Sequence, residues 1–183
     1  MPNASSAEDA LKGCLLGCAV GDALGLPYEG ISRRRLGNWR PIPLRHRLLF
    51  GHGMLSDDTE HQCITAVAIA RSGDDTESFG RELAWQLRFW LASLPPATGL
   101  ATLRACLKLC LGFSHRTSGV DSAGNGPAMR APVIGVCFRD RPKVRNQLVE
   151  ISTRITHTDS KAQIGANAVA SSAAMAAGSV GNG

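Results

Sequence analysis

The chain has 183 residues, which is enough for one domain with a proper hydrophobic core, and it is 44% hydrophobic and 19% charged, as is ordinary for a soluble globular protein. A net charge of +5 does not by itself indicate a nucleic-acid-binding protein. We see no apolar stretch long enough and sufficiently free of charge to span a bilayer. Small residues are abundant and aromatic residues make up only 5%, so we expect a single all-α domain over residues 1–183.

The six cysteines form no CxxC pair, and most of them lie in apolar helical context. Without paired histidine or cysteine ligands nearby, a zinc site is not expected, and reduced core thiols are the simplest interpretation. The first nine residues contain no basic region leading into an apolar core, so we expect no secretory signal. These features together predict a cytoplasmic protein.

The first predicted helix is capped by Ser5 or Ser6 and ends at Gly25. Three glycines recur at every fourth position along it, which lowers helix propensity, so we expect a neighbouring element to approach closely there. These are Gly13, Gly17 and Gly21.

Residues 31–53 are rich in arginine, proline and glycine and show no periodicity, so we expect a long loop. Its densest basic part runs from Arg33 to Arg47. We interpret this charge as a solvated surface, and the alternative is steering of a phosphate-bearing ligand. Only Trp39 interleaves with the charges, so we expect no nucleic acid partner.

Three further helices follow the loop. The second begins at Ser56 and runs to about Arg71, the third follows a turn at residues 72–75 and ends before Pro95, and the fourth spans about Thr98 to Leu111. The expected apolar face of the third contains Phe79, Leu83, Leu87, Trp90 and Leu91, widened by Trp85 and Phe89. The expected apolar stripe of the fourth contains Leu100, Leu103, Leu107, Cys110 and Leu111.

Residues 113–126 are rich in glycine and serine and lead into Pro127, which suits a first helical position. A glycine-rich loop that enters a helix is a general cradle for anions, because backbone N–H groups point outward there. This loop is neither a Walker A loop nor a dinucleotide-binding fingerprint. The helix it opens ends near Phe138, and two more helices run to about Ile155 and Ala177, with no convincing strand pair.

The stretch Ser56-Asp57-Asp58-Thr59 has two interpretations. Ser56 is a good N-cap, and acids are favoured in a first helical turn because the unpaired N–H groups attract negative charge. Hydroxyl and carboxylate oxygens at one helix start also suit Mg²⁺, Mn²⁺ or Ca²⁺. The pattern alone favours the first interpretation, a capped helix start.

Four segments together resemble the ADP-ribosylglycohydrolase family. They are Gly17–Gly25 with Glu29, Ser56–Thr59, Gly124–Arg130 and Thr156–Asp159. No segment is specific alone, but their order and spacing cover nearly the whole chain. The resemblance implies an all-α fold and a metal-dependent hydrolase that cleaves the glycosidic bond between ADP-ribose and a modified protein side chain or related acceptor.

The resemblance also implies roles for particular residues. Two Mg²⁺ or Mn²⁺ ions would be bound with the help of Ser56, Asp57 and Asp58. Glu29, on a loop that closes near the ribose, would act with Asp57 and Asp58 in catalysis. The implied ligand-binding set is Asp22, in a supporting or structural role, with Gly124, Asn125, Gly126, Pro127, Ala128 and His157. His157 alone would read equally well as a cation at a helix C-terminus.

The chain departs from the family in one respect. The resemblance implies a second group of metal ligands in an Asp-x-Asp-Thr motif, and no such motif follows Asp159. We therefore expect a domain that lacks its C-terminal part and leaves an apolar face uncovered. The alternative function is a catalytically inactive relative that binds ADP-ribose or has a structural role. The acceptor and the oligomeric state stay open.

Overall fold

The computed structural model describes residues 4–32, 34–35, 45–46, 48–95 and 98–179, and within these ranges the chain forms seven α-helices and no sheet. The helices are α1 (Ala4–Gly25), α3 (Asp57–Ser72), α4 (Thr76–Ala92), α5 (Leu100–Cys110), α6 (Gly126–Cys137), α7 (Pro142–Thr156) and α8 (Ser160–Ser179). Two short 3-10 turns, η1 (Leu26–Tyr28) and η2 (Leu49–Gly51), lie between α1 and α3. The predicted all-α fold is confirmed.

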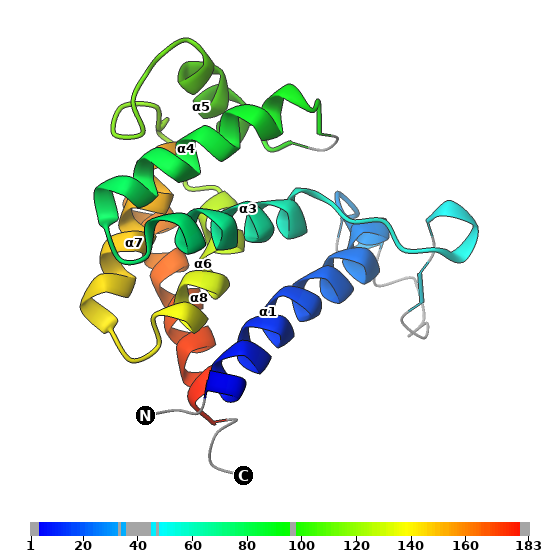
Figure 1. Ribbon diagram of the computed structural model, residues 1–183. Helices are drawn as coiled ribbons and strands as arrows, with labels where there is room; N and C mark the ends of the chain where they lie inside the picture. Colours follow the sequence, from blue (N-terminus) through cyan, green and yellow to red (C-terminus); the bar gives the residue numbers. More distant parts are fainter. Residues whose placement is uncertain (1–3, 33, 36–44, 47, 96–97, 180–183) are drawn as a thin grey trace.

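Helix α6 is the centre of the domain, because it contacts α1, α3, α7 and α8. Figure 1 shows α4 and α5 at one end of the molecule, and the first turn of α1 beside the last turn of α8 at the other. The largest fully buried apolar side chains come from α4, α5, α6 and α7. They are Phe79, Leu83, Leu87, Leu109, Ile134, Leu148 and Ile155.

The closest helix approach is that of α6 to α8. A Cβ added at Gly135 of α6 would overlap the backbone carbonyl of Ala170 in α8. The prediction of a close approach along the glycines of α1 is wrong for the described residues, since nothing lies within 4 Å of a Cβ at Gly13, Gly17 or Gly21. The close contact therefore lies in the core, and the glycine face of α1 is open.

Replacing Gly135 with alanine is expected to lower the free energy of unfolding by about 2 kcal/mol, because the added methyl forces α6 and α8 apart. The matched control is Gly165→Ala in α8, where a Cβ meets nothing within 4 Å. That control should raise stability by about 0.5–1 kcal/mol through helix propensity. Urea denaturation of both variants measures the difference, and equal effects would contradict the packing described.

The apolar stripe predicted for α5 is wrong. The structure buries the small or polar side chains Thr102, Ala105 and Cys106 together with Leu109. Leu100, Leu107 and Leu111 are 60%, 48% and 79% exposed, and Cys110 is exposed as well. Leu103 is partly buried, so the buried face of α5 is offset from the predicted stripe and includes smaller side chains.

The apolar face of α4 is narrower than predicted. Phe79, Leu83, Leu87 and Trp90 are buried. Trp85 and Phe89 are about half exposed and instead contact each other edge to face, with ring centroids 4.9 Å apart.

The interpretation of the cysteines as thiols buried in the core is wrong for half of them. Cys106 is buried and Cys14 and Cys18 are partly so, whereas Cys63, Cys110 and Cys137 are exposed.

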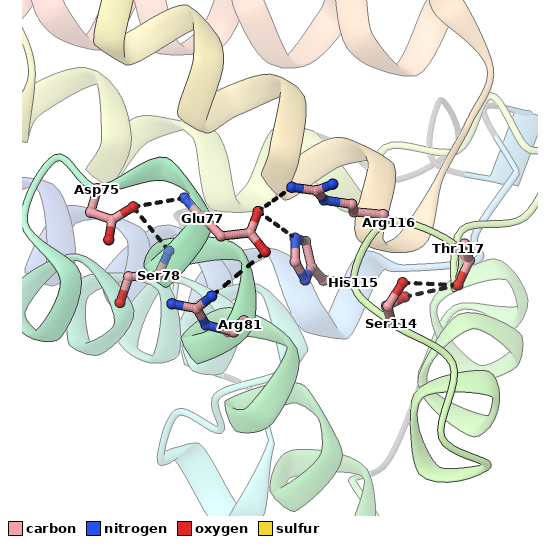
Figure 2. A network of polar contacts seen from close by, with 8 residues as sticks. All are labelled: Asp75, Glu77, Ser78, Arg81, Ser114, His115, Arg116 and Thr117. Carbon is pink, nitrogen blue, oxygen red and sulfur yellow. Dashed lines mark hydrogen bonds and ion pairs between the residues drawn. The ribbon is translucent and has the colours of Figure 1, made fainter.

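The first part of the loop over residues 113–126 contacts the start of α4 through Glu77 (Figure 2). Glu77 forms ion pairs with Arg116 at 2.6 Å and with Arg81 at 3.7 Å, and the ring of His115 lies 3.6 Å from its carboxylate. The His115 ring also lies against Gly80, where a Cβ would come 2.6 Å from it. These contacts fix the path of the chain from α5 toward residues 118–126.

Helix α1 differs from two of our expectations, one about where it begins and one about its apolar character. It begins at Ala4, so Ser5 and Ser6 lie inside it rather than capping it. Residues 6–28 are long and apolar enough to cross a membrane by length and composition, contrary to our expectation, although core helices and signal sequences meet the same criterion. Only a small share of this segment is buried in the described structure.

Most of the predicted boundaries of the remaining helices agree with the structure to within about two residues. The Arg-rich loop is only partly described: Arg34, Arg35 and Arg45 are exposed, as a solvated loop requires, while Arg33, Trp39, Arg40 and Arg47 lie outside the described residues.

Candidate functional site

A cavity of about 540 Å³ lies where the starts of α3, α5 and α6 meet the end of α7. Its volume is within the usual range of small-molecule sites. Seven of the predicted site residues line it. They are Glu29, Asp57, Asp58, Gly124, Asn125, Gly126 and His157. The other predicted residues, Asp22, Ser56, Pro127 and Ala128, are not among the lining residues.

One wall of the cavity is acidic. Ser56 caps α3 by accepting a hydrogen bond from the Asp58 N–H at 3.3 Å, which places both aspartates in the first helical turn. Burial raises the pKa of Asp57 to about 6, and the nearby Asp58 and Glu29 carboxylates add to the rise. The pKa of Glu29 is raised by burial and then by Asp58. This wall therefore holds negative charge that the described protein residues do not neutralise.

Asp22 lies outside the cavity and holds the start of α3, which carries the acidic wall, by hydrogen bonds. Its carboxylate accepts hydrogen bonds from the Ser56 N–H at 2.8 Å, the Ser56 hydroxyl at 2.7 Å, the Thr59 hydroxyl at 2.5 Å and the Thr59 N–H at 3.3 Å. Burial alone would raise the pKa of Asp22, but the hydrogen bonds from Thr59 and Ser56 outweigh it and hold the pKa below its usual value. Asp22 thus fixes the start of α3 to the end of α1.

Replacing Asp57 with asparagine should raise the free energy of unfolding at pH 7 by about 1 kcal/mol in the absence of divalent ions. The substitution removes a partly buried charge that lies near Asp58 and Glu29. Chemical denaturation in chelator measures this change. Asp74→Asn is the matched control, because Asp74 is exposed and forms an ion pair with Arg141 at 2.6 Å, and its loss should not stabilise the fold.

The opposite wall is the glycine-rich loop, which lies on the end of α7. The Ser118 hydroxyl donates to the Ile155 carbonyl at 2.8 Å, the Val120 N–H donates to the Thr156 carbonyl at 3.2 Å, and the Thr158 N–H donates to the Val120 carbonyl at 3.0 Å. A Cβ at Gly119 would overlap the Arg154 carbonyl. Glycine at that position is therefore required for the loop to reach α7.

His157 lies directly under this loop. A Cβ at Gly124 would come 3.0 Å from His157 Nε2, and one at Gly126 would come 2.8 Å from His157 Cε1. The loop thus stays close to the imidazole because two of its residues have no side chain. His157 is 2% exposed, and burial followed by the positive charge of Arg130 lowers its pKa to about 4.

The sequence analysis missed the start of α5. Residues 99–102, together with Gly30, Ser122 and Met129, line the cavity. In the described structure neither Gly99 at α5 nor Asn125 at α6 makes a side-chain capping bond, so two uncapped helix N-termini meet the same cavity. Gly99 lies inside the helix predicted from Thr98, and a helix start placed after this glycine is the signal that could have indicated an uncapped N-terminus.

The two walls therefore have opposite polarity. Carboxylates of Glu29, Asp57 and Asp58 favour a cation at one end, and backbone N–H groups at the starts of α5 and α6 favour an anion at the other. Within the described ranges, no group of three or more His, Cys, Asp or Glu side chains is arranged to hold a metal ion. The oxygen donors suit a hard divalent cation, but the set is smaller than a complete site needs.

Acid should destabilise the protein through His157. Its pKa is lowered in the folded state, so the unfolded state binds the proton more readily, and stability is lost as pH falls from about 6.5 toward 4. His157 alone should contribute a loss on the order of 1–2 kcal/mol between pH 7 and pH 5. The raised pKa of Asp57 acts in the opposite direction and offsets about 1 kcal/mol of this loss, so the net loss in the wild type is smaller than the His157 contribution.

Urea midpoints at pH 7 and pH 5 measure this loss in the wild type and in His157→Gln. Relative to its own stability at pH 7, the variant should be more stable at pH 5 than the wild type by the His157 contribution, whatever its stability at pH 7. An unchanged difference would assign the acid sensitivity to another group, such as His61, whose pKa burial also lowers.

Comparison with known proteins decides the family. The family model described as ADP-ribosylglycohydrolase matches residues 3–182. The chain belongs to the ADP-ribosylglycohydrolase family. The resemblance predicted from the four sequence segments is thereby confirmed.

Relatives within and near this family support the assignment. An uncharacterized protein of Archaeoglobus fulgidus is 35% identical over 169 residues, covering 89% of this chain and 54% of that protein. The ADP-ribosyl-[dinitrogen reductase] glycohydrolase of Rhodospirillum rubrum is 30% identical over 161 residues, covering 83% and 52%. The chain thus spans about half the length of these two relatives.

A solved structure, described as an ADP-ribosylglycohydrolase-related protein complex, has the same fold. Its TM-score to this chain is 0.69 at 26% sequence identity, and the match covers 91% of this chain and 55% of the other. The helical arrangement described above is therefore that of the ADP-ribosylglycohydrolase fold over the part that this chain spans.

Proposed function

We propose that this protein acts on ADP-ribose conjugates as a metal-dependent hydrolase, cleaving the glycosidic bond between ADP-ribose and a modified acceptor. The observation that carries the proposal is the single cavity that joins the acidic turn of α3 to the glycine-rich loop before α6. Family membership and the name of the Rhodospirillum rubrum relative give the substrate class.

The polarity of the cavity fits the two ends of such a substrate. A diphosphate is a doubly charged anion, and it suits the uncapped N-termini of α5 and α6 and the open backbone at Gly124 and Gly126. The ribose that carries the scissile bond would then lie toward Asp57 and Asp58. The cavity volume of about 540 Å³ suits a ligand of this size in an open cleft.

Asp57 and Asp58 are the residues that would hold a divalent cation such as Mg²⁺ or Mn²⁺, and Ser56 would keep them in position through its capping bond. Such a cation, when bound, would orient ribose hydroxyls and make a water molecule more acidic. Glu29 lies on the same wall in the exposed turn after η1, where its raised pKa suits proton transfer at the ribose.

A second candidate function is ADP-ribose binding without cleavage. It is favoured by one observation: the described residues bring together no metal-holding group of three acidic or metal-ligating side chains. Because the chain spans about half of its relatives, the remaining ligands of an active site would come from elsewhere. Both candidate functions require ADP-ribose binding, and only the hydrolase would cleave the glycosidic bond.

Thermal stability with and without Mg²⁺ and ADP-ribose tests the proposal. A ligand that binds only the folded state at 100 times its dissociation constant stabilises by about 2.7 kcal/mol, which should raise the melting temperature by roughly 5–10 °C. We expect this shift to require both the metal and ADP-ribose. Asp57→Asn should abolish the part that depends on metal, and Asp74→Asn should keep it.

Turnover is then measured as release of free ADP-ribose from peptides modified on arginine or on serine. Release that depends on Mg²⁺ and is lost in Asp57→Asn supports the hydrolase. A metal-dependent thermal shift with release at background supports the binding relative instead. No shift with any combination of ligands would contradict both.

A further inference from the structure

A buried arginine lies behind the cavity, and the site described above does not use it. Arg130 of α6 is 0% exposed, and in the described part of the chain it forms no ion pair with a carboxylate. Burial lowers its pKa to about 10, so it keeps its charge at neutral pH. A buried cation without a counter-charge is costly, which suggests that its position matters for more than stability.

The hydrogen bonds of Arg130 connect three helices. Its Nε donates to the Ser152 hydroxyl at 3.0 Å, and its Nη2 donates to the Ser152 carbonyl at 2.8 Å and to the Thr156 hydroxyl at 2.7 Å. Its Nη1 lies 3.0 Å from Nδ1 of the buried His61 in α3. Because a guanidinium can only donate, each of these partners must act as an acceptor.

The Thr156 hydroxyl links Arg130 to His157 by hydrogen bonds. Its oxygen accepts from Arg130, so its own proton is free to be donated. The nearest acceptor is His157 Nδ1 at 2.9 Å, whereas the Thr153 carbonyl is 3.5 Å away. Donation to Nδ1 leaves the ring proton of a neutral imidazole on Nε2. Nε2 is the nitrogen that lies beneath Gly124 at the cavity.

We propose that Arg130 is a positioning residue that acts through Thr156 to hold His157 as the Nε2–H tautomer. His157 then presents a neutral N–H donor to the cavity, and the charge of Arg130 stays behind it. The donor is suited to an anionic oxygen, such as one of a diphosphate. Only this last statement rests on the proposed function, since the tautomer is a property of the free protein.

The same reasoning applies to His61 and gives an internal reference. Arg130 donates to its Nδ1, so its proton must also lie on Nε2, which has no hydrogen-bond partner among the described atoms. The ring of Trp90 lies 4.3 Å away and nearly perpendicular to it, an arrangement that accommodates an N–H near an aromatic ring. His61 does not contact Thr156 in this network, so changes at Thr156 should leave it unaltered.

Nitrogen-15 NMR of the histidine rings in the ligand-free chain tests the tautomer directly. We expect His157 and His61 to show a protonated Nε2 and an unprotonated Nδ1 at pH 7, with His157→Gln providing the assignment. Thr156→Ser keeps the hydroxyl and should keep this pattern. Thr156→Val removes it and should shift His157 toward the Nδ1–H form while leaving His61 unchanged.

Thr153→Val is the matched control, because it removes a buried hydroxyl of the same helix that donates only to the Val149 carbonyl. It should leave the His157 signals as in the wild type. A wild-type His157 protonated on Nδ1, or equal spectra for Thr156→Val and Thr156→Ser, would overturn the proposal. Variants that fail to fold show themselves in the same spectra, and Thr156→Ser and the wild type still decide the outcome.

A second measurement separates this proposal from the proposed function. Calorimetry with ADP-ribose in the presence of Mg²⁺ should show affinity about tenfold weaker in Thr156→Val and unchanged in Thr153→Val. If the wild type binds no ADP-ribose with Mg²⁺ present, the proposed function fails while the NMR result still decides the tautomer. If binding is intact and equally strong in Thr156→Val, the donor role of His157 is overturned.

Discussion

A single buried guanidinium sets the geometry of this domain. Arg130 joins α6 to His61 of α3 and to Ser152 and Thr156 of α7, and each bond requires an acceptor in a fixed place. A charged group that is fully buried cannot release one partner without leaving a donor unsatisfied, which costs more than the bond itself contributes. Three of the four helices that border the cavity, α3, α6 and α7, therefore cannot move independently.

The acidic wall depends on a second buried polar group, the carboxylate of Asp22 at the start of α3. Asp22 accepts four hydrogen bonds from Ser56 and Thr59, and these residues bracket the two aspartates that face the cavity. The carboxylates of Asp57 and Asp58 are thus held close together despite their repulsion. The energy that opposes this repulsion comes from the hydrogen bonds of Asp22, which lies outside the cavity.

The sequence predicted most of the helices and most of the cavity, for physical reasons that differ between the two. Helix boundaries follow local signals such as Ser56 as an N-cap and the proline at position 127, and the structure agrees with them. The grouping of Glu29, Asp57 and His157 came from the family resemblance, since residues so far apart in the chain carry no local signal of their proximity.

What the sequence could not predict depends on distances between helices. The buried face of α5 combines the small residues Ala105 and Cys106 with Leu109, and which face of the helix is buried depends on how it lies against α4 and α7. The glycines of α1 suggested a close neighbour that the described structure lacks, while Gly135 provides one. Arg130 was treated only as part of a motif, because nothing in its local sequence indicates a buried cation.

The bond between Asp22 and the start of α3 has a consequence for local unfolding. Helix α1 is largely exposed, and its end is attached to the rest of the domain through this carboxylate. Detachment of α1 would remove the acceptor of Ser56 and Thr59, so the turn that carries Asp57 and Asp58 would fray in the same event. A cation bound at the start of α3 would therefore oppose the release of α1. Occupancy of the site and protection of α1 from hydrogen exchange would then report on the same equilibrium.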